Sequence, residues 1–149
     1  MIEIPDRTWL FDGLQKSNAI VCGSAVVRQE LRNIPKKDLI GNEKTRNLCL
    51  NLYDALVEDK RNYAVTNLVE VAAKAYFENY VGKYSWEELE KDFLIVATAS
   101  VHKVNIVVSN DEKTMISKDC INAYNSANKM LQFETPKFMK LGEFRHLFK

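Results

Sequence analysis

The feature that most constrains the fold is a capped helix that runs directly into a short β-branched strand. Ser85-Trp-Glu-Glu88 has the pattern of a capping box, in which the Ser85 hydroxyl accepts the amide hydrogen of Glu88. Apolar residues then recur at helical spacing to about Lys103, and residues 104–109 are Val-Asn-Ile-Val-Val-Ser. Such a run is typical of an inner strand that is covered on both faces. The segment therefore predicts a sheet with helices packed against it.

The rest of the chain extends this prediction to a fold class. Residues 19–22, Ala-Ile-Val-Cys, predict a second buried strand, and no stretch rich in Gly, Pro or Ser offers a linker within the 149 residues. We therefore expect one domain over residues 1–149, an α/β three-layer sandwich with a mostly parallel central sheet. The other predicted elements are helices over 43–57, 62–80 and 118–131, an edge strand over 132–138 interrupted by Pro136, and a short helix over 141–148.

Composition excludes several classes of protein. Lys and Arg number 21 against 20 Asp and Glu, a net charge of +1, which excludes a polybasic nucleic-acid binder. The three cysteines show no zinc spacing and are expected to be free thiols. No segment has the pattern of a signal peptide or of a membrane span, so we expect a cytoplasmic protein that does not enter a membrane.

Acidic residues stand where a parallel α/β sheet binds its ligands, beyond the carboxyl ends of the strands. Asp92 differs, because it lies within a helix beside an apolar run, where a carboxylate is costly unless it faces water or a cation. Carboxylates that gather without His or Cys favour Mg²⁺ or Mn²⁺ over zinc, and such a site can hydrolyse phosphodiesters. The candidate ligands are Asp6, Glu30, Asp92 and Asp111.

Three stretches with these acids carry a family resemblance. The strongest is Asp92-Phe-Leu-Ile-Val-Ala-Thr-Ala-Ser100 followed by Ile106-Val-Val-Ser-Asn-Asp111. The others are Ile20–Leu31, which contains Glu30, and Pro5–Gly13, which contains Asp6 and Thr8. Together they resemble the PIN domain, the metal-dependent nuclease fold of VapC-type toxins and of RNA-processing factors.

The resemblance implies a Mg²⁺- or Mn²⁺-dependent endoribonuclease. Asp6, Glu30, Asp92 and Asp111 would hold the metal and activate water, and Ser109 and Thr8 would orient the groups around it. RNA would be the substrate, and a cognate antitoxin or another protein would be a further partner. A homodimer is also implied, as is common among toxins of this family.

Other interpretations stay open beside this one. A PIN-like module without catalysis could bind RNA or act as a scaffold. The chain could also be an unrelated doubly wound domain that binds a nucleotide or a protein. Asp6 could cap a helix over residues 9–16 instead of binding a metal. The aromatic residues Tyr76, Phe77, Tyr80 and Trp86 predict a core or an oligomer contact. A set of basic residues is either a phosphate-binding track or a group of solvated helix faces: Arg28, Arg32, Lys36, Lys37, Lys44, Arg46, Lys60 and Arg61.

Overall fold

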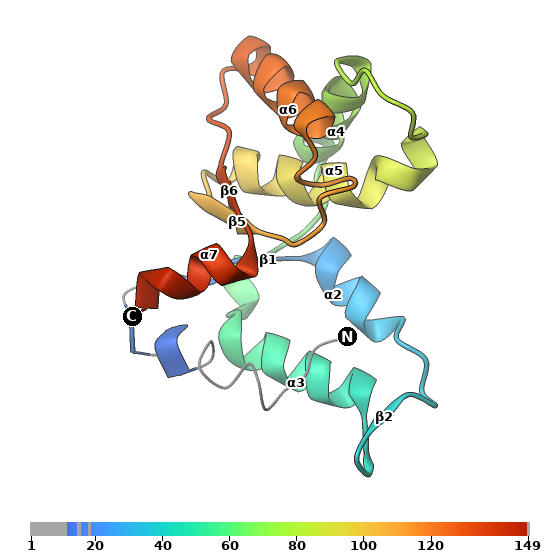
Figure 1. Cartoon of the computed structure of the whole chain (residues 1–149), viewed down its shortest axis with the longest axis vertical. Helices are drawn as coiled ribbons and strands as arrows, with labels where there is room; N and C mark the ends of the chain where they lie inside the picture. The colour runs from blue at the N-terminus through green and yellow to red at the C-terminus, as the bar shows by residue number, and fades with distance from the viewer. Residues whose placement is uncertain (1–11, 15, 18, 149) are drawn as a thin grey trace. The chain divides into compact units, whose positions relative to one another are not determined.

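A computed structural model describes residues 12–14, 16, 17 and 19–148 (Figure 1). These residues form two compact units. Unit 1 contains the described residues up to Tyr63 together with residues 145–148, and unit 2 is Ala64–Phe144. Helices and short strands occur in both units, which confirms a mixed α/β class. A single domain over residues 1–149 stays a prediction.

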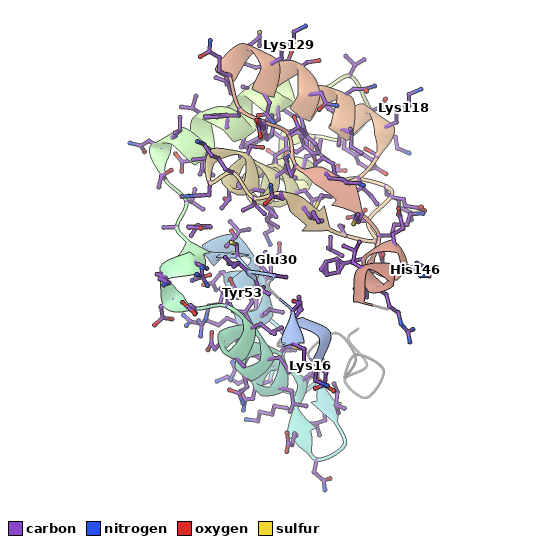
Figure 2. The ribbon with its side chains drawn as sticks, turned by 90° about the vertical axis from the view of Figure 1, so that its left-hand side faces the viewer. Lys16, Glu30, Tyr53, Lys118, Lys129 and His146 are labelled. Carbon is purple, nitrogen blue, oxygen red and sulfur yellow. The ribbon has the colours of Figure 1, made fainter. Side chains whose placement is uncertain are left out.

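Unit 2 is built on three helices, α4 (Asn67–Glu78), α5 (Trp86–Val101) and α6 (Lys118–Leu131). Helix α4 packs against both α5 and α6 (Figure 1). The ring of Tyr76 makes edge-on contacts with Phe93 and Tyr124, and all three side chains are fully buried. Of the four aromatic residues predicted to form a core or an oligomer contact, Tyr76 lies in this core, and Phe77, Tyr80 and Trp86 are partly buried and pack against it. Figure 2 labels Lys118 and Lys129 near the two ends of α6, and both residues are exposed.

Each of these helices begins with a hydroxyl cap. The side chains of Thr66, Ser85 and Ser117 accept the third amide hydrogen of their helices over 3.3, 3.3 and 3.2 Å. These caps satisfy amide groups that have no partner within the helix. The Ser85 contact confirms the predicted cap, and α6 has the predicted bounds.

The strands of unit 2 are β5 (Ile106–Val108) and β6 (Lys137–Met139), which pair in parallel with Val107 opposite Phe138. Helix α6 lies between them in sequence, and the segment after β6 continues into α7 (Leu141–Arg145) and the 3-10 turn η3 (His146–Phe148). Pro136 precedes β6 directly, where its missing N–H removes no ladder bond. The predicted strand therefore begins later than expected.

The described residues of unit 1 include two short strand pairs and the packed helices α2 (Ala25–Arg32) and α3 (Thr45–Leu56). Strand β1 (Gly23–Ser24) runs parallel to β4 (Asn62–Tyr63), and β2 (Leu39–Ile40) forms a hairpin with β3 (Glu43–Lys44). Helix α2 packs against α3, and the 3-10 turn η2 (Asp59–Arg61) leads into β4. A side chain at Gly23 would collide with the hydroxyl of Tyr53, so the close approach of β1 to α3 requires glycine here.

The strand predicted over residues 19–22 is wrong. Residues 19–22 are outside any strand, and the side chain of Ile20 is 63% exposed. The partner strand β4 has two residues, and these pair with Gly23 and Ser24, so the β-branched run has no ladder to join. The described strands form three separate pairs, and the central sheet of a three-layer sandwich stays a prediction. No helix in the described ranges is both long and apolar enough to cross a bilayer.

Candidate functional site

Asp92 and Asp111 lie together in unit 2, joined by the side chain of Thr114. Asp92 is a half-buried residue of α5, and Asp111 is an exposed residue of the loop after β5. The Thr114 Oγ1 atom lies 2.6 Å from Asp92 Oδ2 and 2.6 Å from Asp111 Oδ2. The two carboxylate oxygens are therefore no further apart than twice that distance. The structure brings together the two acids of the strongest sequence motif.

The loop around Asp111 is held by its own hydrogen bonds. The backbone N–H groups of Lys113 and Thr114 donate to Asp111 Oδ1 over 3.2 and 3.0 Å. The Asp111 carbonyl accepts the N–H of Ile116 at 3.0 Å. This is the arrangement by which an aspartate organises a turn through the following amides. Asp111 thus presents a fixed carboxylate instead of a mobile surface side chain.

The core anchors the far end of this loop. The hydroxyl of Tyr124, a fully buried residue of α6, donates to the carbonyl of Met115 over 2.8 Å. Met115 is itself 8% exposed and belongs to the hydrophobic core. Ser117 then caps α6, so the chain leaves the loop in a defined direction. The hydroxyl of Thr114 is therefore carried on backbone that is fixed on both sides.

The segment that follows β6 holds the near end of the loop. Ser109 donates its N–H to the carbonyl of Met139 over 3.0 Å, which continues the β5–β6 ladder by one residue. The Leu141 N–H donates to Asn110 Oδ1 over 2.9 Å. An ion pair between Glu112 and Lys140 adds a contact between the same two segments. The position of Asp111 therefore depends on residues at both ends of the β5–α6–β6 unit.

The two carboxylates have opposite electrostatic environments. Burial raises the pKa of Asp92, and the negative charge of Asp111 raises it further, while the hydrogen bond from Thr114 opposes both effects. The hydroxyl of Thr114 lowers the pKa of Asp111, helped by the two backbone N–H donors and the positive charge of Lys113. A hydroxyl has one proton and can donate to one carboxylate at a time. The Thr114 hydroxyl therefore donates to one of the two carboxylates at any moment, while its oxygen lies 2.6 Å from both.

Ser109 lies at the start of the same loop. Its hydroxyl oxygen accepts the backbone N–H of Asp111 at 3.1 Å, so it supports the turn that carries the aspartate. The role implied for it, orienting the surroundings of a metal, stays a prediction. Its closeness to Asp111 agrees with the spacing of the sequence motif.

The other sequence candidates are placed elsewhere or lie outside the described residues. Asp6 and Thr8 fall outside the ranges that the structure describes. Glu30 is an exposed residue of α2 in unit 1 (Figure 2). Across the described residues, no three or more His, Cys, Asp or Glu side chains form a group that could hold a metal. The site that can be built from described residues is therefore the Asp92–Asp111 pair.

Thr114 was not among the residues singled out by the sequence. The signal that could have found it is the spacing Asp111-Glu-Lys-Thr114, because an aspartate followed by a turn places the third residue back against its carboxylate. The contact to Asp92 could not be read in this way, since the two residues are 22 positions apart.

Several of the basic residues in unit 1 have acidic partners. The Arg28 guanidinium binds both carboxylate oxygens of Asp54, over 3.0 and 2.9 Å, and holds the pKa of that carboxyl below its usual range. Lys60 and Arg61 lie 3.4 and 3.6 Å from the same oxygen of Glu58. Their charges are partly offset locally, which weakens the case for one continuous phosphate track.

Comparison with known proteins adds no relative. No protein-family model matches the chain, and neither the curated proteins nor the solved structures contain a significant match. The chemistry of the site therefore depends on its own geometry. The two carboxylates supply hard oxygen ligands of the kind that Mg²⁺ and Mn²⁺ prefer.

Proposed function

We propose that this protein is a Mg²⁺- or Mn²⁺-dependent ribonuclease of the PIN type, and that Asp92 and Asp111 are central to its active site. One observation carries the proposal: the two carboxylates approach the same Thr114 hydroxyl at 2.6 Å each. Neighbouring oxygens around Mg²⁺ are about 3 Å apart and opposite ones about 4 Å, given ligand distances of about 2.1 Å. A pair held this closely can serve one cation with a small adjustment.

The residues of the chain would hold the metal and orient the groups around it. Asp92 and Asp111 would hold the metal, which when bound supplies a nucleophilic hydroxide and stabilises charge on the phosphate. Asp111, held by backbone amides, would keep the cation at the rim of unit 2, where a polymer can reach it. Asp92, half-buried on α5, would fix the inner side. In the complete site Asp6 and Glu30 would add ligands, and Thr8 and Ser109 would orient the surrounding groups.

The finer features of the sequence resemblance belong to the same proposal. The chain would adopt the three-layer PIN arrangement with a mostly parallel sheet, act on RNA in the cytoplasm, and form a homodimer. An antitoxin or another protein would be its partner. Exposed lysines such as Lys113 beside the acids supply positive charge for a phosphate backbone.

Metal titration with matched variants tests the proposal. The melting temperature of the wild type should rise with added Mn²⁺ or Mg²⁺, because a ligand that binds the native state stabilises it by mass action. Asp92→Asn and Asp111→Asn should remove both this shift and the cleavage of a structured RNA while keeping the helical circular dichroism spectrum. Glu90→Gln is the control, because Glu90 is an exposed acid on the same helix as Asp92. Cleavage that survives both Asp→Asn variants would contradict the mechanism.

A second candidate is a PIN-like module that binds RNA without cutting it. The observation that favours it is the absence, within the described residues, of any group of three or more potential metal ligands. Such a module would bind RNA with the same affinity whether Mn²⁺ or EDTA is present. Its melting temperature would not respond to Mn²⁺ either. In a metal-dependent nuclease, both the RNA affinity and the melting temperature would change with Mn²⁺.

A further inference from the structure

We infer that Thr114 is a positioning residue of this site, whose hydroxyl ties the carboxylate on α5 to the carboxylate on the loop after β5. This inference rests on the proposed function for its catalytic consequence. Asp92 and Asp111 belong to different elements, and the Thr114 Oγ1 atom lies within hydrogen-bonding distance of both. A side chain in this position sets the spacing of the pair before any cation arrives.

The two carboxylates depend on Thr114 to different degrees. Asp111 is also held by the backbone N–H groups of Lys113 and Thr114, which remain when Thr114 is replaced by valine or serine. Asp92 reaches the loop through the Thr114 hydroxyl. Loss of this hydroxyl therefore leaves Asp111 in place and releases Asp92, and the two like charges then repel each other across the gap.

Threonine suits this role because its backbone and its side chain are both constrained. The chain is fixed on one side by Asp111 and on the other by Met115, whose carbonyl accepts the Tyr124 hydroxyl. The β-branched side chain of threonine has restricted rotation about χ1, so a fixed backbone gives the hydroxyl a defined direction. Valine has nearly the same shape without the hydroxyl, and serine keeps the hydroxyl without the methyl group.

The first test uses the metal-free protein and does not require activity. Asp92→Asn is introduced into the wild type, T114V and T114S, and urea unfolding midpoints are measured in EDTA. In T114V, where the carboxylates repel, Asp92→Asn should raise the midpoint by more than it does in the wild type. In T114S the effect should match the wild type. An equal effect of Asp92→Asn in all three backgrounds would overturn the link through Thr114.

Thr98→Val is the matched control for this comparison. Thr98 is a buried residue of α5, and its hydroxyl donates to the Leu94 carbonyl of the same helix over 2.7 Å. The substitution removes a hydroxyl from the same unit without touching either carboxylate. The effect of Asp92→Asn in the T98V background should therefore equal that in the wild type.

The second test measures the catalytic consequence with Mn²⁺ as the probe. T114V should weaken Mn²⁺ binding by about tenfold or more, the loss typical when a group that orients a metal ligand is removed. It should lower kcat for RNA cleavage with little change in KM, while T114S restores both binding and rate. Wild-type affinity and kcat in T114V would overturn the inference. A wild type that neither binds Mn²⁺ nor cleaves RNA would instead overturn the proposed function, and the midpoint comparison would still decide whether Thr114 links the pair.

Discussion

The hydroxyl of Tyr76 on α4 lies 2.8 Å from Oδ1 of Asn128 on α6, in the interior of unit 2. The same hydroxyl lies 2.9 Å from Ser100 Oγ on α5, and Asn128 Nδ2 donates to Ser100 and to Thr135. Asn128 is 1% exposed, so these bonds replace its contacts with water. A buried polar network whose members are all paired specifies one arrangement of its helices. Here it fixes α5, which carries Asp92.

Asn128→Ala should destabilise unit 2 by about 3 kcal/mol, because it removes the buried acceptor of the Tyr76 hydroxyl and the amide group that donates to Ser100. Urea unfolding monitored by circular dichroism gives the free energy of unfolding. Asn125→Ala is the control, since Asn125 is an exposed residue of the same helix and should change stability by less than about 0.5 kcal/mol. Equal effects of the two substitutions would contradict a structural role for the network.

Asp92→Asn should stabilise the metal-free protein more as the pH rises. Because the folded pKa of Asp92 is raised, the native state holds this proton more tightly than the unfolded state. The stabilisation from Asp92 is therefore present at low pH and is lost as pH rises from about 4 through the folded value. The Asp92→Asn variant lacks this pH-dependent loss of stability, because asparagine does not titrate. Unfolding is measured in EDTA between about pH 3 and about pH 7. The free energy of unfolding of Asp92→Asn should increase with pH relative to that of the wild type.

Asp111→Asn provides the opposite sign as an internal control for this pH experiment. The folded pKa of Asp111 is lowered, so its contribution is present at neutral pH and is lost as pH falls through the folded value. Asp111→Asn should therefore fall below the wild type at neutral pH. Parallel pH profiles for the two variants would contradict the opposite environments of the carboxylates.

Asn110→Ala should loosen the loop that carries Asp111 while leaving the helices of unit 2 intact. The substitution removes the acceptor for the Leu141 N–H, a bond to a neutral group worth about 1 kcal/mol. Hydrogen exchange at the Leu141 amide should become about fivefold faster, which is the factor that corresponds to about 1 kcal/mol. Exchange at amides in the middle of α4 should not change. An unaltered rate at Leu141 would show that this bond does not hold the loop.

If the protein binds RNA as proposed, Lys36 and Lys37 should contribute more to the RNA affinity than Arg28 does. Lys36 and Lys37 are exposed, whereas the guanidinium of Arg28 is already bound to Asp54. Replacing both lysines with alanine should weaken RNA binding and reduce the slope of log affinity against log salt by about one to two. Arg28→Ala should change this slope by less. Fluorescence anisotropy at several salt concentrations makes the comparison, and equal slopes for the two variants would contradict it.

Local signals in the sequence were sufficient for the helices. The cap at Ser85 and the apolar periodicity within 62–80, where α4 lies, each act within a few residues, so no distant contact is needed to recognise them. The prediction of a strand over 19–22 was wrong because strand pairing depends on residues distant in the sequence. The β-branched residues of this segment satisfy the preference for a strand, but the partner strand β4 pairs with Gly23 and Ser24.

The same distinction applies to the site. Asp92 and Asp111 could be paired from their places in one motif, and the structure brings them together. The contact of Thr114 with Asp92 depends on the path of the loop from β5 to α6, which the spacing of residues does not give. Glu30 belongs to unit 1, whereas Asp92 and Asp111 belong to unit 2, and the sequence motifs do not show this division.

The bond between Asn110 and Leu141 spans 31 residues of chain. A ribosome makes the chain from its N-terminus, so α5 and Asp92 emerge well before the segment that completes the Asp111 loop. Until Met139 and Leu141 have emerged and β6 has paired with β5, the loop lacks the contacts that hold its near end. A nascent chain therefore carries both carboxylates before it can hold them in place, and the pair is assembled only after β6 and Leu141 have been made.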